Sequence, residues 1–521
     1  MLFKKRTFET VHHLLPVNLF TWCLLLLTVL GYIFIGYWLS RENFLQYLAC
    51  YLLLFAVYFQ LLKRNVRTGQ DIPIFKNLEG ISAESTGLLL NRKSDLSILI
   101  IAGIVFRFLF LLCMPALSDD YFRFAWDGTM WTSGENPYTI IPAVYLQECD
   151  KHVNYLIDLY NGMNSPKYYT VYPPISQFIF GISAQLFPEN LLGTVIMNRL
   201  FCIAAEMGTI LLLQKILVHF NLPKRNVLLY ALNPLVIIEL SGNLHLEAVM
   251  IFFLALAIYL LIKSMHHIKT IEEPFSFFSP KQPSVIVLGQ PVKPGELEPP
   301  VAKRLLLYSA LSFGAAIATK LIPLLFLPFL IKRLKWKQSL LYFFITGISF
   351  IVLFIPFINQ QLLIQWGSSI QLYFQHFEFN ASLYYLTRWI GFETVQHDII
   401  RLAGPLMALI TFISIIYLAE REKNISWKHF FEAMQWSLTI YLLLATTVHP
   451  WYITTLVLCS VITGYKYPIV WSLLIALTYA TYQTIPYQEN LWLVALEYIL
   501  VVGVLIYELN SRFHKRQLQF R

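Results

Sequence analysis

The sequence predicts an all-α polytopic membrane protein. Hydrophobic residues make up 57% of the 521 positions and charged residues only 13%, whereas a soluble domain carries about 25% charged residues. Apolar runs long enough to cross a bilayer recur along the chain and are separated by short basic segments. Together these features exclude a soluble enzyme, a disordered chain and a small disulfide-stapled scaffold.

The first group of predicted helices consists of long apolar runs, because about 20 apolar residues span the hydrocarbon core. They occupy 17–39, 43–62, 95–114, 190–213, 339–358, 402–420, 430–448 and 490–509. A second group is shorter and is often interrupted by Pro or Gly, which membrane helices tolerate when neighbours satisfy the freed backbone groups. Its members are 173–187, 227–240, 246–263, 304–318, 320–331, 450–465 and 468–484.

Basic residues between these runs predict the orientation, since cytoplasmic loops are enriched in Lys and Arg. Placing every basic segment in the cytoplasm gives about 14 transmembrane helices with both termini cytoplasmic. This requires that 173–187 does not cross fully and that 304–331 crosses twice or not at all. The net charge of +9 is then a topological bias, and no nucleic-acid partner is expected.

The same topology divides the chain into three regions. Residues 1–94 form an N-terminal transmembrane hairpin and a cytoplasmic loop, and 466–521 form C-terminal helices with a basic cytoplasmic tail. The core, 95–465, contains an acidic outer loop at 115–172 and a Pro-rich cytoplasmic linker at 264–303. The polar clusters that could carry chemistry all fall on the outer side of this core.

The strongest polar cluster begins the first outer loop. Asp119 and Asp120 directly follow an apolar run, and a carboxylate at a poorly solvated membrane edge suits a general base. Aromatic residues at positions 122, 126 and 131 repeat at helical spacing, so we expect a short helix resting on the membrane interface. Arg123 lies four residues after Asp119, the spacing of an ion pair within a helix. The alternative is that the two carboxylates only cap this helix.

Two further clusters place ionisable residues inside apolar stretches, where they usually face a cavity or a partner. His245 and Glu247 interrupt one such stretch, and the alternative to a binding role is that they pair with each other at a helix joint. Lys320 separates two apolar half-segments. Its ammonium suits a lipid phosphate as a point charge, and the alternative is that it extends to the membrane surface.

Two more clusters lie in the later outer segments. Glu378, Asn380 and Arg388 place an acid, an amide and a cation in one loop, although Glu378 and Arg388 could simply pair with each other. His449 stands where a membrane helix ends outside, close to Trp451. Interfacial anchoring explains the tryptophan without any chemistry, but it explains the histidine less well.

Three ionisable residues fall inside predicted spans: Arg107, Arg199 and Glu206. We expect them to pair between helices, and the alternative is that they line a cavity. The sequence contains no GxxxxGK[ST] and no HExxH, and no GxGxxG follows a strand. This excludes the common motifs of P-loop ATPases, dinucleotide-binding folds and zinc proteases.

Taken together, the clusters between about residues 95 and 455 resemble bacterial mannosyltransferase-like proteins of the GT-C superfamily of membrane glycosyltransferases. The resemblance rests on segments 118–128 (SDDYFRFAWDG), 136–138 (NPY), 172–174 (YPP), 233–235 (NPL), 242–247 (GNLHLE), 319–323 (TKLIP), 378–380 (EFN) and 449–452 (HPWY). The commoner bacterial form has Tyr-Arg-Tyr where this chain has Phe122-Arg123-Phe124. Residues 1–94 are an addition to the usual core.

The resemblance implies a polyprenyl-phosphate-linked sugar donor, with mannose as the hexose, and a lipid or glycan acceptor. Transfer would take place on the outer face of the bacterial cytoplasmic membrane and build a cell-envelope glycan, with inversion at the anomeric carbon. Asp119 or Asp120 would be the general base. No cofactor is required; a divalent Mg or Mn ion is compatible with an Asp pair, but the sequence indicates no metal ligands.

The resemblance and the clusters together nominate two further groups of residues. Contacts to the donor phosphate are expected from Arg123, Lys320, Arg388 and His449. Contacts to the sugar or acceptor are expected from Asp127, Asn136, Tyr172, Asn243, His245, Glu247, Glu378 and Asn380.

Other functions share parts of this pattern. A transporter or flippase for lipid-linked saccharides would also have basic inner loops and Pro-broken helices, but an inverted repeat would favour it and none is visible. A large outer loop with paired Arg residues would favour an oligosaccharide ligase, whereas 359–401 has only Arg388 and Arg401. A non-catalytic scaffold would tolerate replacement of both Asp119 and Asp120.

Overall fold

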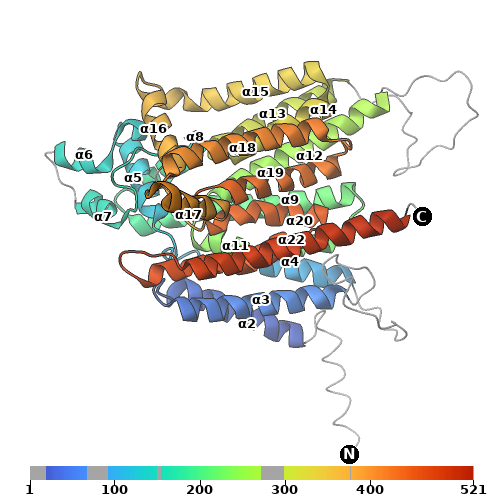
Figure 1. Ribbon diagram of the computed structural model, residues 1–521, viewed down its shortest axis with the longest axis horizontal. Helices are drawn as coiled ribbons and strands as arrows, with labels where there is room; N and C mark the ends of the chain where they lie inside the picture. The colour runs from blue at the N-terminus through green and yellow to red at the C-terminus, as the bar shows by residue number, and fades with distance from the viewer. Residues whose placement is uncertain (1–18, 67–91, 149–153, 272–298, 376, 520–521) are drawn as a thin grey trace, which may run out of the picture.

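The computed structural model describes residues 19–66, 92–148, 154–271, 299–375 and 377–519. Within these ranges the chain is an assembly of helices, most of which run roughly side by side in one bundle (Figure 1). Among the described residues, the β-structure consists of an isolated bridge between Phe379 and Thr447. The predicted all-α fold class is therefore confirmed.

Eight of the described helices are long and apolar enough to cross a membrane. They are α2 (Leu19–Tyr37), α3 (Phe44–Val66), α9 (Leu191–His219), α12 (Glu247–Ile271), α13 (Pro299–Thr319), α15 (Trp336–Phe354), α18 (Ile400–Arg421) and α22 (Leu491–Gln519). Shorter helices complete the bundle: α4 (Arg92–Phe108), α19 (Trp427–Leu444), η6 (Pro450–Tyr452), α20 (Ile453–Thr463), α21 (Tyr467–Leu474) and η7 (Ile475–Gln483). This supports an integral membrane protein; the larger number of spans and the cytoplasmic termini stay predictions.

Several of the shorter apolar runs are broken into pieces. The run at 227–240 divides into α10 (Leu228–Ala231), α11 (Pro234–Ile237) and the π-helix η3 (Ile238–Gly242). The break comes at Asn233, whose side chain accepts hydrogen bonds from the N–H groups of the next two non-proline residues and so starts a new helix. The run at 320–331 becomes the 3-10 helix η4 (Ile322–Phe329), which contains two prolines, followed by α14 (Leu330–Leu334).

The helices of the two long loops gather at one end of the bundle, at the left of Figure 1. They are α5 (Asp120–Thr132), α6 (Pro142–Glu148), α7 (Asn154–Gly162), α8 (Pro174–Leu186), α16 (Leu362–Gln375) and α17 (Leu383–Val395). The C-terminus of α22 lies at the opposite end. With 13 residues, α8 is about 20 Å long, too short to cross a hydrocarbon core of about 30 Å.

Most of helix α5 is covered by other protein segments, while its position relative to the membrane interface stays a prediction. Phe124 and Trp126 are each 1% exposed. Phe124 stacks on Phe180 of α8, with ring centroids 4.4 Å apart. Gly128 brings the two helices together, because a Cβ atom there would lie 2.3 Å from the carbonyl oxygen of Phe180.

The three ionisable residues that fall inside predicted spans are bonded to other groups of the protein. Arg107 and Glu206 form a fully buried ion pair at 2.8 Å, which confirms the pairing expected for these two residues. Arg199 instead donates to the carbonyl oxygens of Ser241 and Gly242, at 2.7 and 3.0 Å. Its guanidinium thus satisfies backbone groups at the end of η3, where the regular helical ladder stops.

Replacing Gly128 with Ala should destabilise the protein, because the new methyl group would push α5 away from the α8 backbone. Overpacking of this kind costs about 1–3 kcal/mol, which should appear as a lower midpoint in a thermal unfolding scan. The matched control is Gly347→Ala in α15, where a Cβ atom meets nothing within 4 Å. If Gly128→Ala unfolded at the same temperature as the control, the close α5–α8 contact would be contradicted.

Candidate active site

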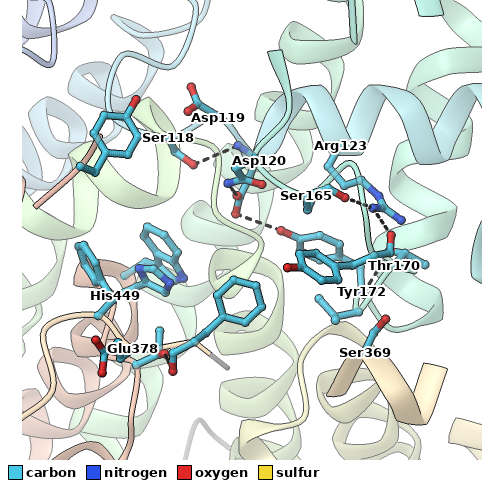
Figure 2. A pocket seen from close by; sticks show the side chains of 18 of the residues that line it. Ser118, Asp119, Asp120, Arg123, Ser165, Thr170, Tyr172, Ser369, Glu378 and His449 are labelled. Carbon is cyan, nitrogen blue, oxygen red and sulfur yellow. Dashed lines mark hydrogen bonds between the residues drawn. The ribbon is translucent and has the colours of Figure 1, made fainter. Parts of the chain in front are cut away.

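A cavity of about 350 Å³ lies at the end of the bundle where the long loops gather. Five stretches of chain supply most of its lining: 118–123, 164–172, 377–379, 447–451 and 481–487 (Figure 2). Six residues predicted from the sequence meet here: Asp119, Asp120, Arg123, Tyr172, Glu378 and His449. We call this space the polar cavity.

The two adjacent carboxylates have different partners. Asp120 accepts hydrogen bonds from the Asn164 side-chain amide and from the Tyr172 hydroxyl, both at 3.0 Å (Figure 2). Asp119 occupies the N-cap position of α5, but its side chain makes no capping hydrogen bond. Its Oδ2 lies 2.5 Å from Nη1 of Arg41. The alternative that the two acids only cap the helix is therefore wrong, and both line the cavity.

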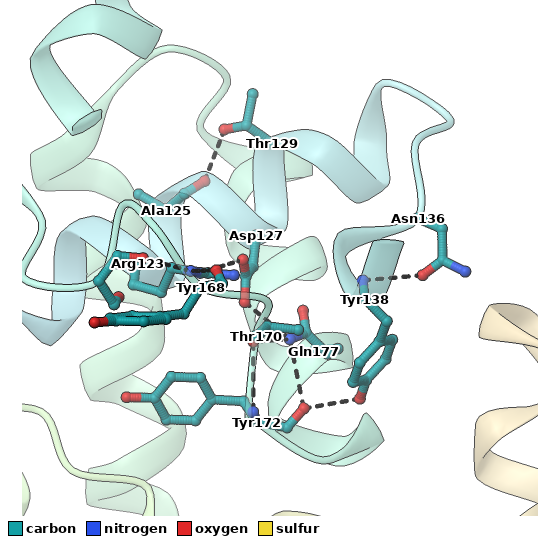
Figure 3. Close-up of polar contacts among 11 residues, drawn as sticks. Arg123, Ala125, Asp127, Thr129, Asn136, Tyr138, Tyr168, Thr170, Tyr172 and Gln177 are labelled. Atoms are coloured by element: carbon teal, nitrogen blue, oxygen red, sulfur yellow. Dashed lines mark hydrogen bonds and ion pairs between the residues drawn. The ribbon is translucent and has the colours of Figure 1, made fainter. Parts of the chain in front are cut away.

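The Arg123 side chain is buried in the wall of the cavity and bonds to several groups there. Its Nε donates to Oδ1 of Asp127 at 2.7 Å, and its Nη1 donates to the carbonyl oxygens of Ser165 and Tyr168 (Figure 3). The other oxygen of Asp127 accepts from Gln177 of α8 at 2.9 Å. Arg123 is 2% exposed and Asp127 is fully buried. These contacts fasten segment 165–172 to α5 and α8.

This arrangement corrects two expectations. The helical ion pair forms between Arg123 and Asp127, not between Arg123 and Asp119. The guanidinium of Arg123 borders the cavity, with Nε and Nη1 engaged by the protein's own groups and Nη2 without a hydrogen-bond partner among the described residues. A contact from Arg123 to the donor phosphate therefore stays a prediction. The carboxylate of Asp127 is fully buried and is not part of the cavity lining, so it supports the wall.

Three amides predicted to contact sugar have structural partners instead. Asn136 accepts from the N–H of Tyr138 at 3.1 Å and so caps a 3-10 turn, η1 (Pro137–Thr139) (Figure 3). Asn243 connects the N–H of Leu117 to the Glu239 carboxylate. Asn380 is fully buried and donates to Glu497 at 3.2 Å.

The far wall of the cavity is built by a short extended pairing. The N–H of Phe379 donates to the carbonyl of Thr446 at 3.0 Å, and the N–H of Val448 donates to the carbonyl of Phe379 at 2.8 Å. Glu378 and His449 both line the cavity here. Arg388 pairs with Glu378 at 2.7 Å, which is the alternative to a phosphate contact, and Arg388 is not among the lining residues. Burial raises the pKa of Glu378, and the charge of Arg388 opposes that rise.

His449 is a flat, neutral part of this wall. Its ring stacks on Trp451, with centroids 4.3 Å apart and planes 9° apart, and more loosely on Phe379. Burial lowers the pKa of His449 to about 3, and the charge of Lys320 acts in the same direction. Near neutral pH the imidazole therefore offers a hydrogen bond and a stacking face, not the positive charge expected for a phosphate contact.

Trp451 is not an interfacial anchor. It is 8% exposed and lies between two imidazoles, because its other neighbour, His245, stacks on it at 3.5 Å. His245 is 1% exposed, and its Nε2 lies 3.6 Å from the Glu239 carboxylate. The alternative that His245 pairs with Glu247 is therefore wrong.

A second cavity, of about 290 Å³, adjoins the first. We call it the apolar cavity, because leucine, isoleucine, valine and tyrosine side chains make up nearly all of its lining: Val171, Tyr172, Leu321, Ile322, Leu324, Leu325, Tyr441 and Tyr452. Its charged residues are Lys320 and Glu247, whose Nζ and Oε1 atoms lie 3.2 Å apart. Val171 and Tyr172 line both cavities, so one short segment separates them.

Sequence reasoning missed several residues of the polar cavity and its surroundings. Asn164, Tyr482 and Tyr487 line the cavity, and Arg41 contacts it through Asp119. The sequence contains one signal for Arg41. The predicted topology places the turn between the first two helices on the same side of the membrane as the 115–172 loop, so Arg41 and the acidic residues of that loop share one side.

In the part of the chain that the structure describes, no three His, Cys, Asp or Glu residues group together to hold a metal ion. Asp119 and Asp120 are engaged by a guanidinium, an amide and a phenol.

Replacing Arg123 with Gln should lower the thermal unfolding midpoint strongly. The change leaves the Asp127 carboxylate buried without its cation, and removing one partner of a buried pair costs about 3–5 kcal/mol. Arg388→Gln is the matched control, because that ion pair has a similar distance but both side chains are about a third exposed, where pairs contribute about 0–1 kcal/mol. An Arg123→Gln protein that kept its unfolding midpoint would contradict the structural role.

Comparison with known protein families connects this site to a chemistry. Residues 77–335 match the family described as alpha-(1->6)-mannopyranosyltransferase, N-terminal domain. Comparisons with curated proteins and with solved structures gave no match. The matched stretch, just under half of the chain, includes Asp119, Asp120 and Lys320. Together with the membrane-length helices, this similarity supports a membrane mannosyltransferase.

Proposed function

We propose that this protein transfers mannose from a polyprenyl-phosphate carrier to a hydroxyl group of a glycan or lipid acceptor. The observation that carries the proposal is the pair of adjoining cavities. One is polar and contains the carboxylates of Asp119, Asp120 and Glu378, and the other is apolar and contains the ion pair of Lys320 and Glu247. Both border Tyr172, within the stretch that matches the mannosyltransferase family. A sugar joined to a lipid phosphate likewise has a polar part, the sugar, and an apolar part, the lipid chain with its phosphate at the junction.

The apolar cavity suits the lipid end of the donor. Its aliphatic and aromatic lining can pack against isoprene units. The Lys320 ammonium pairs with Glu247 at 3.2 Å and has further N–H donors that can bind a phosphate. Lys320 is 20% exposed, and its Nζ lies 4.9 Å from the centre of the Tyr172 ring. Negative charge grows on the lipid phosphate as the sugar leaves, and a fixed cation in a shielded place stabilises that charge.

The polar cavity suits the acceptor and the base. In the proposed step, an acceptor hydroxyl oxygen forms a bond to the anomeric carbon while the bond from that carbon to the phosphate oxygen breaks. The lipid phosphate leaves with the electron pair, and the hydroxyl proton passes to the carboxylate of Asp119 or Asp120. Such a direct displacement inverts the anomeric carbon. Cofactors are not required for this step.

The location of the cavities supports transfer on the outer face of the membrane. Helix α14 carries Lys332 and Arg333 and lies, like the C-terminus of α22, at the end of the bundle away from α5, α6 and α7 (Figure 1). Basic ends of membrane helices face the cytoplasm. The polar cavity would therefore open outside, in the cytoplasmic membrane of a bacterium, where lipid-linked mannose supplies envelope glycans.

The proposal is tested with purified protein in lipid, polyprenyl-phosphate-mannose as donor, and a membrane extract as acceptor. The native protein should transfer mannose, and either Asp119→Asn or Asp120→Asn should reduce transfer by about 10²–10⁴-fold without changing the thermal unfolding midpoint. Gly347→Ala serves as the folded control. Full transfer by the double Asp variant, or movement of lipid-linked sugar across vesicles with no transfer, would contradict the proposal.

The activity should show no dependence on the ionisation of His449 between about pH 5 and 8. Because burial lowers its pKa to about 3, the imidazole is already neutral throughout this range, and raising the pH removes no proton from it. His449→Phe keeps a stacking ring and should change the rate by the same factor at every pH tested. A step near pH 6.5 in the native profile that vanished in His449→Phe would contradict this account.

A further inference from the structure

We propose that Arg41 is a positioning residue that orients Asp119, and that Asp119 rather than Asp120 is the general base. This inference rests on the proposed function and assigns the two adjacent acids different tasks. It also assigns a task to the N-terminal hairpin formed by α2 and α3, since Arg41 lies in the turn between them. That hairpin precedes the stretch matched by the mannosyltransferase family.

The contact between Arg41 and Asp119 is short and partly shielded. Nη1 lies 2.5 Å from Oδ2, and the two side chains are 26% and 25% exposed. Charge-assisted hydrogen bonds of this kind are the stronger ones and fix the direction of the carboxylate. No described residue donates a hydrogen bond to Oδ1 of Asp119, which leaves that oxygen to receive a proton from a substrate hydroxyl.

The guanidinium is itself held in place by aromatic rings. Its central carbon lies 5.5 Å from the centre of the Tyr482 ring and 5.6 Å from that of Tyr487. Both tyrosines line the polar cavity, as does Asp119, whereas Arg41 is not part of the lining. Arg41 therefore approaches the carboxylate from behind and leaves the cavity side open. A base oriented by a third group in this way is a common arrangement in active sites.

Asp120 is placed differently. Each of its carboxylate oxygens accepts a hydrogen bond, one from Asn164 and one from Tyr172. These contacts join the start of α5 to segment 164–172, which separates the two cavities. We therefore assign Asp120 the role of holding segment 164–172 in place. The charge of Arg41 also reduces the repulsion between the two neighbouring carboxylates.

The experiment measures kcat and the donor KM for Arg41→Gln, Arg41→Lys, Asp119→Asn and Asp120→Asn. Arg41→Gln should lower kcat by about tenfold or more, since small displacements of a catalytic group have effects up to about 10², while the KM stays within about twofold. Arg41→Lys should recover most of kcat, because only one nitrogen of the guanidinium contacts Asp119. Asp119→Asn should be the least active of the four.

The matched control is Arg421→Gln, because Arg421 also lies over a tyrosine ring, Tyr417, at 5.5 Å, but belongs to the last turn of α18 and not to the cavity lining. It should leave kcat unchanged. The inference is overturned if Arg41→Gln only lowers the unfolding midpoint, or if Asp119→Asn keeps more activity than Arg41→Gln. Absence of mannose transfer by the native protein would instead overturn the proposed function itself.

Discussion

The two cavities of this protein depend on one buried interaction, the pairing of Arg123 with Asp127. From α5, the guanidinium reaches the carbonyl groups of Ser165 and Tyr168 and holds the segment that leads to Tyr172. Tyr172 then contacts Asp120 on one side and Lys320 on the other. The proposed carboxylate base and the proposed phosphate-binding cation are thereby fixed relative to each other by a single stretch of backbone.

The rest of the bundle makes this wall rigid by satisfying polar groups internally. In a membrane each unsatisfied backbone group is costly, so irregular backbone is tolerated only where other protein groups replace its partners. Arg199 does this for the end of η3, and Asn233 does it where α11 begins after a break. The segments next to the cavities can therefore depart from regular helix without becoming loose, which a site that aligns three reacting groups requires.

Much of the site could be predicted from the sequence, because outer loops bring their polar residues to one side of a membrane. Asp119, Asp120, Tyr172, Glu378 and His449 do share one cavity, and Glu247 and Lys320 share its neighbour. Pairing could not be predicted in the same way. Arg123 stands four residues from both Asp119 and Asp127, so only burial decides its partner. Arg41 comes from a hairpin distant in sequence, and no local pattern connects it to Asp119.

The fold class was predictable from the sequence, whereas the number of spans stays a prediction. An apolar run broken by Pro has the same composition as a continuous span, yet the breaks at Pro234 and within η4 produce short helices. Such breaks also have a functional consequence. The break between α13 and η4 falls at Lys320, which lines the apolar cavity.

The most direct test of the account is to locate the donor. A cryo-electron microscopy map of the protein with bound polyprenyl phosphate would show where the phosphate and the first isoprene units lie. The account predicts phosphate density within hydrogen-bonding distance of the Lys320 ammonium and isoprene density along Leu321, Ile322 and Leu325. Lipid density bound elsewhere, with the apolar cavity empty, would contradict it.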